Sequence, residues 1–317
     1  MAFNIADHWI WDFWLADDGA LFHLFYLHAP KSLGNPDLRH RNARIGHATS
    51  TDLRAWTNHG QIFDAGPVGS FDGSATWTGS VVQDADGLWR MFYTGSRFLS
   101  PDTFANVETI GLATSTDLFT WTKQAGPVLV ADRQWYEVLG TSSWPEEAWR
   151  DPWVFWRQDD KLWHMLVTAR SKDGVEPDRG VVGHAVSPDL SAWTVRTPLS
   201  QAGSGFAHLE VFQLVEVDGR NHLVFCCDTA KLVGDRLGQT GGIWSLPVGD
   251  FPEPVDASAA RLLVPESLYA GRIAKDRAGK AWLLAFNNTS PNGDFLGGIC
   301  DPIALTTDQD GYLSVEN

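Results

Sequence analysis

Short runs of alternating apolar and polar residues recur along the whole chain, and a period of two is typical of half-buried β-strands. Helical periodicity is nearly absent. Five of the runs follow turn signals rich in Asp and Gly, such as "ADDG" and "DADG", so each predicts a strand that belongs to a tightly turned strand pair. These runs span residues 21–29, 88–96, 161–170, 221–229 and 280–288.

A longer motif follows four of these runs. It reads "GHATSTDLRAW" from Gly46, "GLATSTDLFTW" from Gly111 and "GHAVSPDLSAW" from Gly183, and a degraded copy starts at Gly241. Each copy predicts an apolar strand, a turn whose Ser and Asp side chains bind nearby backbone groups, a Trp packed on the turn, and another short strand. We interpret the Asp residues of these turns as turn formers without a ligand. They are Asp52, Asp117 and Asp189.

The spacing of the motif predicts the architecture. The copies recur at intervals of roughly 60–70 residues, which leaves room for four short strands in each of five units. Five four-stranded sheets arranged radially form a β-propeller, whose closure leaves only short, protected edges. A β-sandwich is the alternative, but sandwiches do not repeat at this period. We therefore predict an all-β fold, a five-bladed propeller of four antiparallel strands per blade, forming one domain over residues 1–317.

The length and net charge of the chain limit the kinds of molecule that it can bind. The 317 residues suffice for a full-sized core, and no segment approaches the roughly 18 consecutive apolar residues of a membrane-spanning helix. The formal net charge of −15 repels phosphate backbones and anionic lipid headgroups. We therefore expect neither a nucleic acid nor a membrane as a partner.

Cysteine usage and the first residues predict the compartment. Of the three cysteines, Cys226 and Cys227 are adjacent, which disulfide geometry disfavours. The opening "MAFNIADHWIWDFW" has no signal-peptide pattern. We therefore expect a reducing environment and a cytoplasmic location. Cys and His show no metal-ligand spacing, so we expect neither a metal ion nor another cofactor.

Sixteen tryptophans are many for this length and allow two interpretations. Most are packing elements, because an indole buries a large area wherever it lies. Some instead form stacking platforms for an uncharged polar ligand such as a sugar. The stretch "EEAWRDPWVF" (146–155) combines two tryptophans with three carboxylates and an arginine, which is more charge than a fold needs beside so much aromatic surface.

Three acidic residues stand outside the repeat, at similar places in the first, third and fourth units: Asp12, Asp151 and Glu210. In a propeller the innermost strands bring such positions together at the central channel. A carboxylate among apolar residues is either paired or functional, because burying it unpaired costs several kcal/mol. Arg150 beside Asp151 allows a purely structural ion pair there, whereas the other two acids have no obvious local partner.

Two carboxylates that face one another across a pocket can hydrolyse a glycosidic bond. One is ionised and attacks the anomeric carbon or activates water. The other, with a pKa raised by apolar surroundings, protonates the departing oxygen. A third carboxylate held by an arginine can bind sugar hydroxyls and stabilise the positive charge of the transition state.

Several stretches together resemble the five-bladed propeller fructosidases of glycoside hydrolase families 32 and 68, which include β-fructofuranosidases, levanases and levansucrases. The resemblance runs along the whole chain. "WRDPWVF" matches the Arg-Asp-Pro motif of both families, and "WIWDFW" resembles the family 68 nucleophile motif rather than the Asn-Asp-Pro-Asn-Gly form of family 32. No Cys-Pro follows Glu210, so membership of one family or the other stays open. The stretches are 9–14, 77–82, 149–155, 208–214 and 297–313.

The resemblance implies roles for particular residues. Asp12 would be the nucleophile, Glu210 the general acid/base and Asp151 the transition-state stabiliser. For His208 and Tyr269 ordinary packing is the alternative to a place in the sugar pocket. The full set of substrate-binding residues that we predict is Trp11, Trp77, Ser80, Arg150, His208 and Tyr269.

The function that follows is a retaining glycoside hydrolase acting on β-fructofuranosides such as sucrose or short fructo-oligosaccharides. Water or another sugar would resolve the covalent fructosyl-enzyme, the latter giving transfructosylation. The chain ends where family 32 enzymes continue into a β-sandwich, which implies a lone propeller and leaves room for a homo-oligomer. Two alternatives remain: an inverting arabinofuranosidase or arabinanase resembling family 43, and a non-catalytic propeller that binds carbohydrate or docks a protein.

Overall fold

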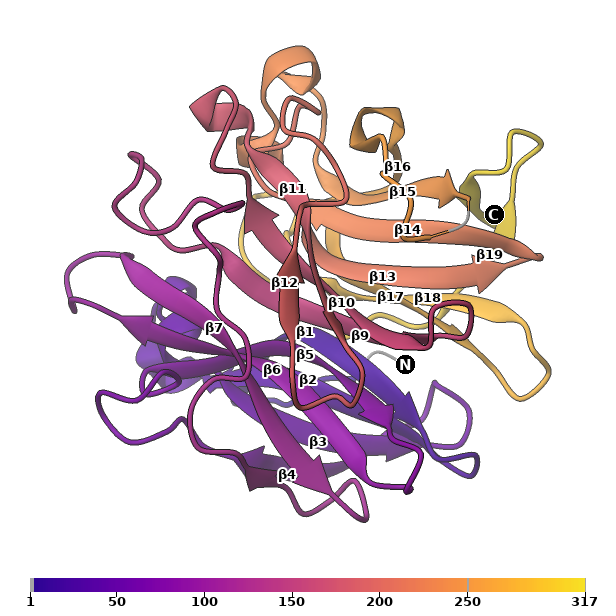
Figure 1. Ribbon diagram of the computed structural model, residues 1–317. Helices are drawn as coiled ribbons and strands as arrows, with labels where there is room; N and C mark the ends of the chain where they lie inside the picture. Colours follow the sequence, from indigo (N-terminus) through magenta and orange to yellow (C-terminus); the bar gives the residue numbers. More distant parts are fainter. Residues whose placement is uncertain (1–2, 250, 317) are drawn as a thin grey trace.

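The computed structural model describes residues 3–249 and 251–316 and consists of five four-stranded antiparallel sheets arranged radially (Figure 1). Within every sheet the strands follow the order of the sequence, so consecutive strands are antiparallel neighbours. The predicted five-bladed β-propeller with four strands per blade is confirmed.

The blades take their strands in chain order. Blade 1 contains β1 (His8–Asp17), β2 (Phe22–Pro30), β3 (Arg44–Ser50) and β4 (Thr57–Phe63). Blade 2 contains β5 (Ala75–Gln83), β6 (Trp89–Phe98), β7 (Asn106–Ser115) and β8 (Thr122–Lys123). Blade 3 contains β9 (Trp149–Arg157), β10 (Leu162–Arg170), β11 (Gly180–Ser187) and β12 (Thr194–Arg196). Blade 4 contains β13 (Glu210–Val217), β14 (Arg220–Cys227), β15 (Gly242–Val248) and β16 (Arg261–Pro265). Blade 5 contains β17 (Leu268–Lys275), β18 (Ala281–Asn287), β19 (Ile303–Thr307) and β20 (Leu313–Val315).

The five runs predicted from their turn signals are the second strands of the blades. The helices of the described residues are short 3₁₀ segments in the connections: η1 (Lys31–Leu33), η2 (Pro36–Asn42), η3 (Glu176–Asp178), η4 (Thr229–Lys231), η5 (Gly234–Arg236) and η6 (Ala257–Ala259). None of these helices has the length or the apolar content needed to cross a bilayer.

The repeated turns are built as their composition predicts. In the second copy, the Asp117 carboxylate accepts hydrogen bonds from the backbone N–H groups of Phe119 and Thr120, at 2.8 and 2.7 Å. The indole of Trp121 donates to the carbonyl of Leu118 at 3.0 Å, and Leu118 has a φ of 64°. The same contacts recur in the first and third copies for the turn Asp, whose role as a turn former is therefore confirmed.

The first strand of each blade lies nearest the axis. β1, β5, β9, β13 and β17 contact one another in this order, and β17 contacts β1. Backbone hydrogen bonds join the first and last blades, because Phe3 and Ile299 exchange two of them at 2.9 and 2.8 Å and Gly298 donates to the Ile10 carbonyl at 2.8 Å. Trp14 and Trp149 are fully buried, as the packing interpretation expects. The ring of inner strands is what carries the candidate site.

Candidate active site

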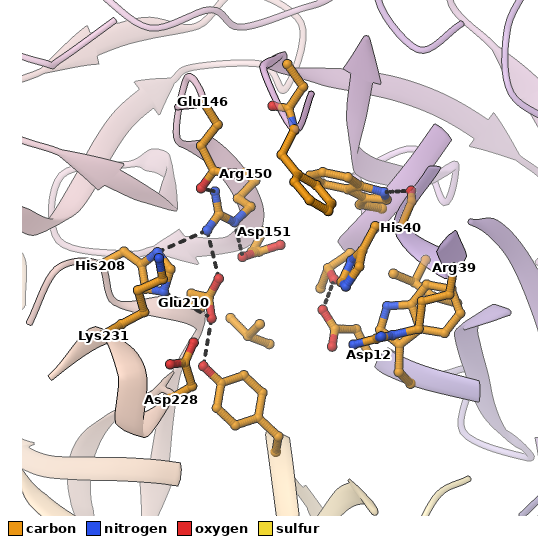
Figure 2. A pocket seen from close by; sticks show the side chains of 18 of the residues that line it. Asp12, Arg39, His40, Glu146, Arg150, Asp151, His208, Glu210, Asp228 and Lys231 are labelled. Carbon is orange, nitrogen blue, oxygen red and sulfur yellow. Dashed lines mark hydrogen bonds and ion pairs between the residues drawn. The ribbon is translucent and has the colours of Figure 1, made fainter. Parts of the chain in front are cut away.

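A cavity of about 530 Å³ lies where the inner strands meet, and all five blades contribute to its wall. This size is within the range of small-ligand pockets. Figure 2 shows Asp12 on one side of the cavity, with Glu210 and Asp151 facing it from the other. The predicted site residues that line the cavity are Trp11, Asp12, Trp77, Arg150, Asp151, His208, Glu210 and Tyr269.

Every inner strand changes register at the level of the cavity. Each shift lies next to residues that line the cavity. The positions are Ile10/Phe13 in β1, Trp77/Gly79 in β5, Arg150/Trp153 in β9, Glu210/Gln213 in β13 and Tyr269/Arg272 in β17. A β-bulge takes a residue out of the ladder and re-aims its side chain. Positive φ values of 58° at Asp151, 56° at Val211 and 48° at Ala270 mark three of the bulges. Such strain costs about 1–3 kcal/mol per residue and is common at functional sites.

Asp12 is half-buried at the bulge of β1. The hydroxyl of Thr78 donates a hydrogen bond of 2.5 Å to Asp12 Oδ2. Burial raises the pKa of Asp12, and the charge of Glu210 adds to this effect, while Thr78, Arg272 and Arg39 oppose it. The carboxyl is thus held in place but is a weaker acid than a solvated aspartic acid.

Asp151 is fixed by two threonines. Its backbone N–H donates to Thr94 Oγ1 at 2.9 Å, and Thr168 Oγ1 donates to its Oδ2 at 2.9 Å. Burial raises the pKa of Asp151 to about 7, and the charges of Asp12 and Glu210 add to this effect although Arg150 opposes it. The charges of the three acids therefore influence one another's titration.

Glu210 has the strongest partners of the three acids. Arg150 Nη2 donates to its Oε1 and the Tyr269 hydroxyl to its Oε2, both at 2.7 Å. His208 Nε2 lies 3.6 Å from Oε2. Burial alone would raise the pKa of Glu210, but His208, Arg150 and Tyr269 outweigh it and lower the pKa to about 2. In this structure the expectation of a general acid with a raised pKa is therefore wrong, because these donors stabilise its charged form.

Arg150 pairs with three glutamates in addition to the adjacent Asp151. Its guanidinium lies 2.7 Å from Glu210, 2.9 Å from Glu108, 3.1 Å from Glu146 and 3.6 Å from Asp151. The predicted ion pair with Asp151 is present, but it is the longest of the four. Glu210, which has no partner nearby in the sequence, is the acid that Arg150 approaches most closely.

Ser80 lies outside the wall of the cavity. It is buried, and its hydroxyl accepts a hydrogen bond from the Val154 backbone at 3.2 Å, which links β5 to β9. In the same "WTGSVV" stretch, Thr78 is the hydroxyl residue that lines the cavity and binds Asp12. The bulge between Trp77 and Gly79 reverses which side chains face the axis, so simple alternation along the strand could not identify Thr78.

The pocket also contains residues that the sequence gave no reason to select. Arg39 lies 3.9 Å from the ring centroid of Phe295, and Lys231 lies 4.7 Å from that of Trp144. Asp228 lines the wall, and burial raises its pKa to about 6 with a contribution from the charge of Glu210. Two further residues of this kind are His40 in η2 and Asn288 after β18. Glu146, from the acidic stretch 146–155, also lines the cavity.

No group of three or more His, Cys, Asp or Glu side chains in residues 3–249 and 251–316 is arranged to hold a metal ion. The arrangement offers instead three interacting carboxyls, two of them opposed across the cavity, with cations and aromatic rings around them. These are the functional groups that cleavage of a glycosidic bond by a general acid and a nucleophile requires.

Comparisons with known proteins agree with this chemistry. A family model described as "Glycosyl hydrolases family 32 N-terminal domain" matches residues 14–292. The chain is 28% identical over 257 residues to a protein named "Beta-fructofuranosidase, insoluble isoenzyme CWINV6" from Arabidopsis thaliana, covering 78% of this chain and 44% of that protein. It is also 28% identical over 207 residues to "Raffinose invertase" from Escherichia coli, covering 62% and 37%. The chain thus spans less than half the length of these relatives.

Solved structures share the fold at low identity. The inulosucrase from Halalkalicoccus jeotgali bound to kestose has a TM-score of 0.82 at 21% identity, with 97% of this chain and 87% of that chain covered. A Microbacterium saccharophilum K-1 β-fructofuranosidase variant has a TM-score of 0.74 at 18% identity, with 100% and 76% covered. These two similarities concern the fold alone.

Proposed function

Because the chain belongs to glycosyl hydrolase family 32, we propose that it cleaves β-fructofuranosides, with sucrose or short fructo-oligosaccharides as substrates and retention of anomeric configuration. The observation that carries the proposal is the meeting of Asp12, Asp151 and Glu210, from three blades, in the wall of one cavity. Their mutual electrostatic influence supports a common site.

In the first step, a carboxylate oxygen of Asp12 attacks the fructosyl anomeric carbon. The glycosidic C–O bond breaks, and the leaving oxygen takes a proton from Glu210. In the second step, Glu210 removes a proton from water while the water oxygen attacks the same carbon and releases Asp12. Asp151 accepts hydrogen bonds from ring hydroxyls, and its charge stabilises the oxocarbenium-like transition state.

The pKa order of the acids constrains this cycle. Asp12 must be ionised and Glu210 protonated, yet burial raises the pKa of Asp12 and the partners of Glu210 outweigh its burial and lower its pKa to about 2. When the three acids hold one proton, these directions favour Asp12 or Asp151 as its position, and the form with Asp12 ionised and Glu210 protonated is a minor tautomer. The pH–rate profile then reports properties of the whole group rather than of one residue.

A second sugar in place of water in the second step would give transfructosylation. The balance between the two reactions depends on the rim of the cavity, where the exposed ring of Phe104 and the Trp144–Glu146 segment form part of the wall. Analysis of the products at high sucrose concentration measures this balance.

We place the protein in the cytoplasm and expect it to meet carbohydrate rather than nucleic acid or membrane. The three free cysteines, two of them buried, support a reducing environment. Cell fractionation tests the location. Light scattering on the purified protein tests whether it forms the homo-oligomer that we considered.

The test of the activity is a substrate panel of sucrose, inulin-type and levan-type oligosaccharides and arabinofuranosides. We expect released fructose, and proton NMR of the first-formed sugar should show the anomer of the substrate. An inverted product would replace the nucleophile role of Asp12 with that of a base, as in family 43-like enzymes. Absence of cleavage of every β-fructofuranoside would overturn the proposal.

A further inference from the structure

Glu108 is a fully buried acid that takes no part in the cavity wall. It lies on β7 of blade 2, opposite Ser96 of β6, and its side chain has no exposed surface. Its Oε2 accepts hydrogen bonds from the backbone N–H of Trp149 at 3.1 Å and from Arg150 Nη1 at 2.9 Å, both on β9 of blade 3. Glu108 therefore bridges two blades behind the pocket.

Such a carboxyl is costly to the fold. Removing a carboxylate from water costs several kcal/mol, and an apolar side chain of similar volume often serves stability as well. The neighbouring part of the same blade interface is apolar, with Phe92, Ile110 and Val154 in one buried cluster. The other oxygen of Glu108, Oε1, has no hydrogen-bond partner. Stability alone therefore gives little reason for an acid at this position.

The geometry of Arg150 supplies a reason. Its Nη1 is bound by Glu108 from behind and by Glu146 at 3.1 Å from the rim, while its Nη2 reaches Glu210 at 2.7 Å. A guanidinium is planar, so two bonds at one end fix the direction in which the other end points. Glu210 is bound in turn by Tyr269, so hydrogen bonds run from blade 2 through blades 3 and 4 to blade 5.

We propose that Glu108 is a positioning residue for the reaction, which aims Arg150 at Glu210 from outside the cavity. The kinetic part of this inference rests on the proposed function, whereas its structural part does not. Burial raises the pKa of Glu108 to about 8 even though Arg150 opposes the shift, so the carboxyl can serve without its charge. Position, rather than charge, is then what matters.

Two substitutions separate position from charge. Glu108→Gln keeps the length of the side chain, and its amide oxygen can accept both hydrogen bonds that Oε2 accepts now. Glu108→Asp keeps the acid but shortens the side chain by one methylene. The Arg150 guanidinium must then either move toward the shortened carboxyl or lose its hydrogen bond to it. Asp72→Asn is the matched control, because Asp72 is another buried acid of the blade 2 region, paired with Lys123 at 2.7 Å and absent from the cavity wall.

The readouts are kcat and KM for sucrose, the pH–rate profile, thermal stability, and crystal structures of both variants. Since a displacement of about 1 Å in a catalytic group can cost 10²-fold in rate, we expect Glu108→Asp to lower kcat by about ten- to a hundredfold. Its pH–rate profile should also shift, because the pKa of Glu210 depends on Arg150. Glu108→Gln should keep kcat within about threefold of wild type, and Asp72→Asn should lower stability without changing kcat.

Wild-type kcat in Glu108→Asp, or a loss in Glu108→Gln at least as large as in Glu108→Asp, would overturn the inference. The crystal structures decide it without any turnover. Arg150 Nη2 should stay within hydrogen-bond distance of Glu210 in Glu108→Gln and leave it in Glu108→Asp. An unmoved guanidinium in Glu108→Asp would refute the inference, whereas an inactive wild type with the expected movement would refute only the proposed function.

Discussion

The hydroxyl of Tyr269 is one of the groups that keep Glu210 ionised, and its removal gives a measurable prediction. Burial raises the pKa of Glu210, but His208, Arg150 and Tyr269 together lower it to about 2. Tyr269→Phe deletes the 2.7 Å hydrogen bond to Oε2 and keeps the ring. A hydrogen bond to a charged group contributes about 1.5–3 kcal/mol and a pKa unit is about 1.4 kcal/mol, so the pKa should rise by about 1–2 units.

Titration of the Glu210 carboxyl by ¹³C NMR measures this directly, and the signal is assigned by its loss in Glu210→Gln. The control is Tyr312→Phe, which removes a hydroxyl that donates to the Ala259 carbonyl at 3.0 Å, outside the cavity. We expect no shift of the Glu210 signal in the control. A change below about half a unit in Tyr269→Phe would refute the electrostatic account of Glu210, since a bond worth so little could not help to hold the charge.

Three further predictions concern the two opposed acids, Thr78 and the buried His184. Asp12→Asn and Glu210→Gln should each abolish sucrose cleavage while circular dichroism stays unchanged, and full activity in either would remove the role assigned to that acid. Thr78→Val should raise the pKa of Asp12 further and lower kcat/KM by about tenfold, because the 2.5 Å hydrogen bond that stabilises the carboxylate is lost; unchanged kcat/KM would contradict this. Burial, with the neighbouring His164, lowers the pKa of His184 to about 3, so its neutral form stabilises the fold above about pH 6.5 and this contribution is lost as pH falls. The difference in unfolding free energy between wild type and His184→Gln should therefore decrease by about 1.4 kcal/mol per pH unit from about 6.5 to 5, and a pH-independent difference in urea denaturation would contradict it.

The fold could be predicted because its information is local and repeated. The turn around Asp117 uses a Ser, an Asp, a left-handed Leu and a Trp at fixed spacing. The contacts of the turn Asp and the left-handed Leu recur in three blades, and the hydrogen bond from the Trp indole recurs in two. Alternation then supplies the strands on either side. Five repeats of one hairpin-rich unit can close only a limited number of ways, so the five-bladed propeller follows from the period.

The positions of the three acids were predictable for the same reason, since they stand outside the repeat at similar places in the blades. Their partners were not predictable. Arg150 is adjacent to Asp151 in sequence, yet its closest carboxylate is Glu210, sixty positions further on. The bulges that orient these side chains leave no sequence signature. The sequence therefore points to Ser80 as a pocket residue, whereas the structure places Thr78 in the cavity wall.

Electrostatics was the second point at which local sequence failed. Apolar neighbours of Glu210 suggested a raised pKa, but Tyr269 and Arg150 arrive from other blades and reverse the direction. Glu108 gives no signal at all, because "NVETIGLATS" reads as an ordinary strand and only the packing of blade 2 on blade 3 shows where its carboxyl points.

In the proposed cycle, Asp12 forms a covalent bond to the sugar while Glu210, across the cavity, donates and accepts the proton. The most direct measurement is mass spectrometry of peptides from Glu210→Gln, quenched after incubation with a fructosyl donor whose leaving group needs no protonation. We expect one fructosyl group on the peptide that contains Asp12, and none when Asp12→Asn is added. A fructosyl group on another residue, or turnover of the donor to an inverted product without any adduct, would contradict it.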